Sequence, residues 1–63
     1  MNVKTVTQSL RNTIKSNQAL LELCAERADY AVYPKCKAYE AKVEVLEMVI
    51  TQLEEFLAEL ESA

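Results

Sequence analysis

The sequence contains no glycine, no histidine and no tryptophan, and its single proline is Pro34. A sheet-rich fold needs turn residues at regular spacing, and their scarcity excludes it. The sequence also has no glycine-rich phosphate loop and no nucleophile with an evident base, so it offers no enzyme signature. No apolar run reaches the roughly 18 residues that a membrane span requires. We therefore expect an all-α, non-enzymatic protein that uses no cofactor and no metal and does not enter a membrane.

Most of the 63 residues are good helix formers, 51% are hydrophobic, and the net charge is −3. A domain of this size buries only about 60% of its unfolded surface, so a second subunit is an attractive source of stability. The acidic balance disfavours a generic nucleic-acid binder. Because the N-terminal residues lead into no apolar run of signal-peptide length, we expect a cytoplasmic protein. Its two cysteines, Cys24 and Cys36, are then reduced thiols.

A first helix is expected over about residues 5–30. Thr5 and Gln8 have the spacing of a capping box at its start. One helical face is apolar, because seam positions recur at spacings of three and four; they are Leu10, Ile14, Asn17, Leu21, Cys24 and Ala28. Asn17 interrupts this seam. It is either a device that fixes register and oligomeric state or a polar residue at the edge of a bundle, and the sequence favours neither.

A second helix is expected over about residues 34–61, after a reversal at 31–33. Pro34 fits the first position of a helix, and Tyr33 before it is kept out of the α region. The rival geometry is a single long helix kinked at Pro34. The second helix carries a sustained heptad pattern, which favours coiled-coil packing; its members are Tyr39, Val43, Leu46, Ile50, Leu53, Leu57 and Leu60.

A second apolar row, Val45, Val49 and Phe56, broadens the stripe of the second helix beyond what one partner helix covers. A lone hairpin would leave this row, with Leu20 or Leu23, in water, and such a patch usually marks an interaction site. We therefore predict an antiparallel two-helix hairpin that dimerises about a two-fold axis into a four-helix bundle. The predicted dimer and core interface comprises Leu10, Ile14, Asn17, Leu21, Tyr39, Val43, Val45, Leu46, Val49, Ile50, Leu53, Phe56, Leu57 and Leu60.

Two polar surfaces are candidates for contact with other molecules. Around the turn, the side chains that could meet a protein partner are Tyr30, Tyr33, Lys35 and Lys37. Tyrosine is enriched in binding hot spots, although tyrosines at a bundle end also cap the core.

Along the first helix, a basic stripe could face nucleic-acid phosphates; it consists of Lys4, Gln8, Arg11 and Lys15. The favoured interpretation is pairing within the hairpin, with Glu54, Glu55, Glu59 and Glu61. Cys36, in the first turn of the second helix, is a weaker candidate for redox sensing.

The chain length, the heptad pattern and the polar stripe resemble the plasmid copy-number Rop family, whose antiparallel hairpins dimerise and bind RNA. The Rop RNA face has a central aromatic residue, whereas this stripe carries only Lys, Gln and Arg, so nucleic-acid binding stays the alternative function. The whole sequence from Lys4 to Glu61 also looks like an early-region accessory protein of a lambdoid bacteriophage. That resemblance implies a regulator that acts in the cytoplasm of a bacterial host and binds an unidentified host or phage protein.

Overall fold

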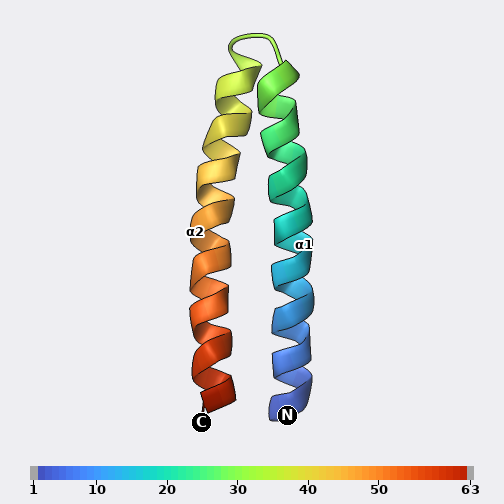
Figure 1. Cartoon of the computed structure of the whole chain (residues 1–63), viewed down its shortest axis with the longest axis vertical. Coiled ribbons are helices and arrows are strands. Elements are labelled where there is room, and N and C mark those ends of the chain that lie inside the picture. Colours follow the sequence, from blue (N-terminus) through green and yellow to red (C-terminus); the bar gives the residue numbers. More distant parts are fainter. Residues whose placement is uncertain (1, 63) are drawn as a thin grey trace.

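The computed structural model describes residues 2–62 and contains two helices, α1 (Val3–Tyr30) and α2 (Lys35–Ser62). The helices lie side by side and antiparallel, so α1 begins where α2 ends (Figure 1). The molecule measures 46 × 14 × 14 Å, consistent with the about 42 Å that 28 residues span at a rise of 1.5 Å. The predicted all-α hairpin is confirmed, and the alternative of one long helix kinked at Pro34 is wrong. Neither helix within residues 2–62 combines the length and apolar character needed to cross a membrane.

The start of α1 is set by Asn2 and not by Thr5. Asn2 has an extended backbone (φ −82°, ψ 136°), and its side-chain oxygen accepts a hydrogen bond of 2.8 Å from the Lys4 amide. Asparagine is among the strongest N-cap residues because its short side chain satisfies a free amide of the first turn. The predicted capping box at Thr5 is therefore wrong, since Thr5 already lies inside the helix.

The chain reverses between the helices without glycine. Ala31 closes the last helical hydrogen bond, with its amide 2.8 Å from the Arg27 carbonyl, and then continues in an extended conformation (φ −72°, ψ 144°). The Lys35 amide donates to the Val32 carbonyl at 2.9 Å, which closes a tight turn around the cis peptide bond that precedes Pro34. No non-glycine residue in the described range has a positive φ. The left-handed cap that favours glycine is therefore not used here.

The core is a single line of side chains between the helices. Ile14, Cys24 and Ile50 are buried. The other seam positions are half-buried, and they are Leu10, Asn17, Leu21, Ala28, Tyr39, Val43, Leu46, Leu53, Leu57 and Leu60. Two helices alone cannot enclose a seam on all sides, so a wider apolar stripe would need further helices to cover it.

Candidate interaction surfaces

The seam divides the hairpin into two faces of opposite character. On α1, Leu20 and Arg11 are nine residues apart, which places them about 180° from each other around the helix. On α2, Val45 and Glu61 are sixteen residues apart and lie about 160° from each other. Arg11 and Glu61 form an ion pair between the helices, whereas Leu20 and Val45 line one groove between them. The helices therefore share a charged face on one side and an apolar face on the other.

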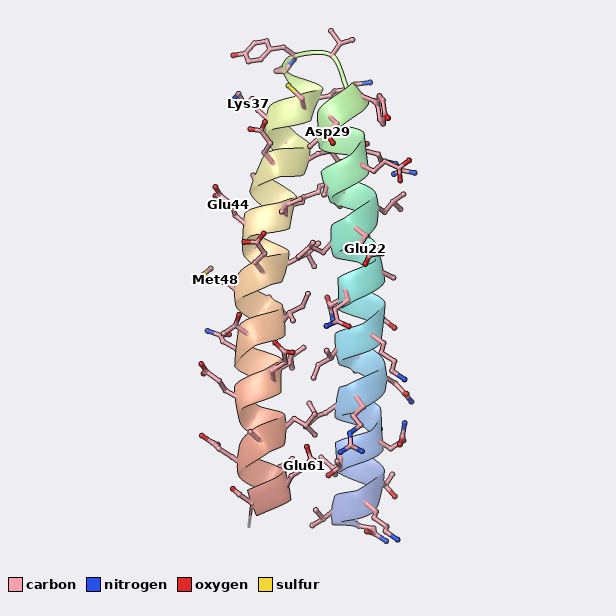
Figure 2. All side chains as sticks on the ribbon, viewed as in Figure 1. Glu22, Asp29, Lys37, Glu44, Met48 and Glu61 are labelled. Carbon is pink, nitrogen blue, oxygen red and sulfur yellow. The ribbon has the colours of Figure 1, made fainter. Side chains whose placement is uncertain are left out.

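Figure 2 shows the charged face, with Glu22 and Asp29 along α1 and Glu61 reaching from the end of α2 toward α1. Glu44 projects from the outer side of α2 in the same view. By helical position this face carries most of the ionised side chains; we define it by Lys4, Arg11, Lys15, Glu22, Asp29, Lys37, Glu40, Glu44, Glu47, Glu54 and Glu61. Both signs of charge occur on it, with acids predominating on α2.

The basic stripe predicted for nucleic acid runs along the charged face. Among residues 2–62, Arg11 is the stripe member that forms an ion pair, and its partner is Glu61. Gln8 donates to the Asn12 side chain at 3.1 Å, and Lys4 and Lys15 are exposed. The predicted pairing within the hairpin thus applies to Arg11. Glu59 cannot join it, because it lies about 160° around the helix from Glu61.

The apolar face contains an open groove of about 520 Å³ near the turn, bordered by Leu20 and Leu23 of α1 and Val45 of α2. Leu20 is 47% exposed, Val45 54%, and Phe56, farther along the same side of α2, 48%. Val49 differs from this row. We expected it to stand in water, but it is half-buried because it lies about 40° closer to the seam than Val45.

Two cations border the same groove, Arg27 of α1 and Lys42 of α2. The Lys42 ammonium lies 5.2 Å from the centre of the Tyr39 ring, within cation–π range. Neither cation was among the predicted site residues. The signal was present in the sequence, since both fall on the same side of the seam as Leu20 and Val45 once the helices are known to be antiparallel.

The turn carries exposed aromatic side chains. Tyr30 is 82% exposed and Tyr33 is 73% exposed, so neither covers the end of the core. Tyr39 is half-buried on the seam and is the tyrosine placed to cover it. Lys35 lines a second hollow with Tyr30 and Tyr39, while Lys37 pairs with Glu40 at 3.3 Å. The predicted partner surface is thus accessible to a protein that approaches the turn.

The two thiols are free and differ in access. Cys24 is only 5% exposed, at the bottom of the apolar groove, and Cys36 is half-buried in the first turn of α2. In the part of the chain that the structure describes, no group of three or more His, Cys, Asp or Glu side chains could hold a metal ion. Comparison of the chain with protein-family models, curated proteins and solved structures found no match.

Proposed function

We propose that this protein is a non-enzymatic interaction module that works as a helical homodimer. The observation that carries the proposal is the apolar face, where Leu20, Leu23, Val45 and Phe56 are exposed on one side of the hairpin. The opposite side is covered by charges. Exposed apolar patches of this kind favour association, and a two-fold dimer of hairpins is the simplest closure because C₂ is the commonest symmetry.

A dimer formed through the apolar face leaves the turn free for a second protein. Tyr30, Val32 and Tyr33 project there and bury little of their surface within the hairpin. Large aromatic side chains gain most from desolvation at an interface, so this turn is the surface we propose for a partner. A regulatory role like that of early phage accessory proteins, which the sequence resemblance implies, would be exerted through this contact.

Sedimentation equilibrium tests the dimer directly. The expected mass is about 14 kDa, twice that of the 7.1 kDa chain. Val45→Glu should shift the equilibrium to monomer because it places a charge within the apolar face. Thr51→Glu is the matched control, a β-branched residue of α2 on the charged side, and it should leave the dimer intact. A monomeric wild-type chain, or equal effects of both substitutions, would contradict the proposal.

Titration with duplex RNA and DNA at low and moderate salt tests the competing function. We expect no binding, because the stripe is flanked by the acids of α2 and Arg11 is already paired with Glu61. Salt-sensitive binding that weakens in Lys4→Ala and Lys15→Ala variants would instead favour a nucleic-acid binder.

A further inference from the structure

The apolar face is neutral in its middle and changes charge sign from one end to the other. Near the turn it carries three cations, Arg27, Lys35 and Lys42, and one acid, Glu26, at the outer edge of α1; all four are exposed. Near the open end it carries Glu59, which is exposed. Lys35 and Lys42 are seven residues apart, so they lie at nearly the same position around α2. Val45 and Glu59 are fourteen residues apart and share a second position. The charge of this face therefore changes from basic near the turn to acidic near the open end, and the middle of the face is apolar.

We propose that the occupant of this face is a second copy of the chain turned end over end, so that the turn of each hairpin lies at the open end of the other. This inference rests on the proposed dimer and specifies its orientation. Rotation by 180° about an axis perpendicular to the helices exchanges the two ends of the face between the copies.

That rotation places the charges at one end of the face opposite those at the other. Glu59 lies three residues before the end of α2, a level that falls between Lys35 and Lys42 of the second copy. Phe56 comes to the half of the second copy that contains the turn. There the groove of that copy, bordered by Leu20 and Val45, is open. Each complementary contact occurs twice in the dimer because the interface is two-fold symmetric.

The alternative dimer, with both turns at one end, sets like charges against each other. Arg27, Lys35 and Lys42 of the two copies would then lie at one level, and Glu59 of both copies would lie at the other. Juxtaposed like charges disfavour an association strongly enough to reject a wrong arrangement. The apolar residues alone do not discriminate between the two orientations, so the charges determine the choice.

Distance measurement between spin labels tests the orientation. A nitroxide on Ser62→Cys, in a Cys36→Ser background with Cys24 buried, reports the separation of the two open ends. The expected distance is about 40 Å, close to the length of a 28-residue helix. With both turns at one end, the labels would be separated by about two hairpin widths, each of 14 Å. A dimer with the shorter distance would overturn the orientation alone, whereas a monomeric wild-type chain would overturn the proposed dimer as well.

Charge exchange tests the specific contact. Lys42→Glu and Glu59→Lys should each weaken dimerisation at least about 5-fold, because each disrupts two symmetric contacts. The double variant should recover most of the wild-type affinity. Lys15→Glu, on the charged face, is the matched control and should leave the dissociation constant unchanged. A double variant no tighter than either single variant would overturn the pairing of Glu59 with Lys42, whatever the state of the wild-type dimer.

Discussion

Arg11 of α1 and Glu61 of α2 form an ion pair between side chains that are fifty positions apart in the sequence. Both side chains are nearly half exposed, so the pair lies at the surface and not in the core. It joins the two helices in the half of the hairpin away from the turn. It also identifies the charged face, because every residue about 180° from it on either helix belongs to the apolar face.

Disruption of this pair should have a small effect. Arg11→Ala is expected to lower the free energy of unfolding by less than about 1 kcal/mol, since exposed ion pairs contribute little in water. Urea denaturation of Arg11→Ala, Glu61→Ala and the double variant gives the coupling energy, and high salt should diminish it. A coupling well above 1 kcal/mol would show that the pair is better shielded from solvent than its exposure indicates.

The N-terminal cap provides a sharper comparison. Asn2→Ala should destabilise the protein by about 1 kcal/mol, because the Lys4 amide loses its acceptor. Thr5→Ala, inside the helix, should be neutral or slightly stabilising because alanine has the higher helix propensity. Thermal unfolding followed by circular dichroism distinguishes the two variants, and the reverse order of stability would place the cap at Thr5 instead.

Asn17 is the polar residue on the otherwise apolar seam, and it is half-buried. Its amide donates to the Thr13 carbonyl at 2.8 Å, so it is satisfied within its own helix. Asn17→Leu should therefore raise the melting temperature by adding apolar burial. If Asn17 also fixes register, the variant should populate more than one oligomeric state in sedimentation velocity. An unchanged mass distribution would assign Asn17 to the bundle edge.

The two cysteines should differ in the reactivity of their thiols and in how much their substitution destabilises the protein. Cys36 should react with a thiol reagent in the native protein, whereas Cys24 should react only as the hairpin opens, because it is 5% exposed. Cys24→Ala should cost about 1 kcal/mol, the cost of a small cavity, and Cys36→Ala should cost less. Equal reaction rates for the two thiols under native conditions would contradict the burial of Cys24.

The sequence by itself determined the two helices, the reversal before Pro34 and the seam between the helices. These features depend on local periodicity and on the conformational limits of proline, which can be read without knowing where the partner helix lies. The sequence was misleading at Thr5, where a capping-box pattern lies inside a helix that Asn2 had already started.

Only the tertiary structure decided which flank of the seam on α1 lies beside which flank on α2. Leu20 and Val45 share a face, and Arg11 meets Glu61, because the helices run in opposite directions in one particular register. A heptad pattern fixes which residues lie on the seam of each helix. It does not fix which flank of one helix adjoins which flank of the other, since that depends on the direction and offset of the partner. The division into a charged and an apolar face, on which the proposed dimer rests, is thus a property of the pairing of the two helices.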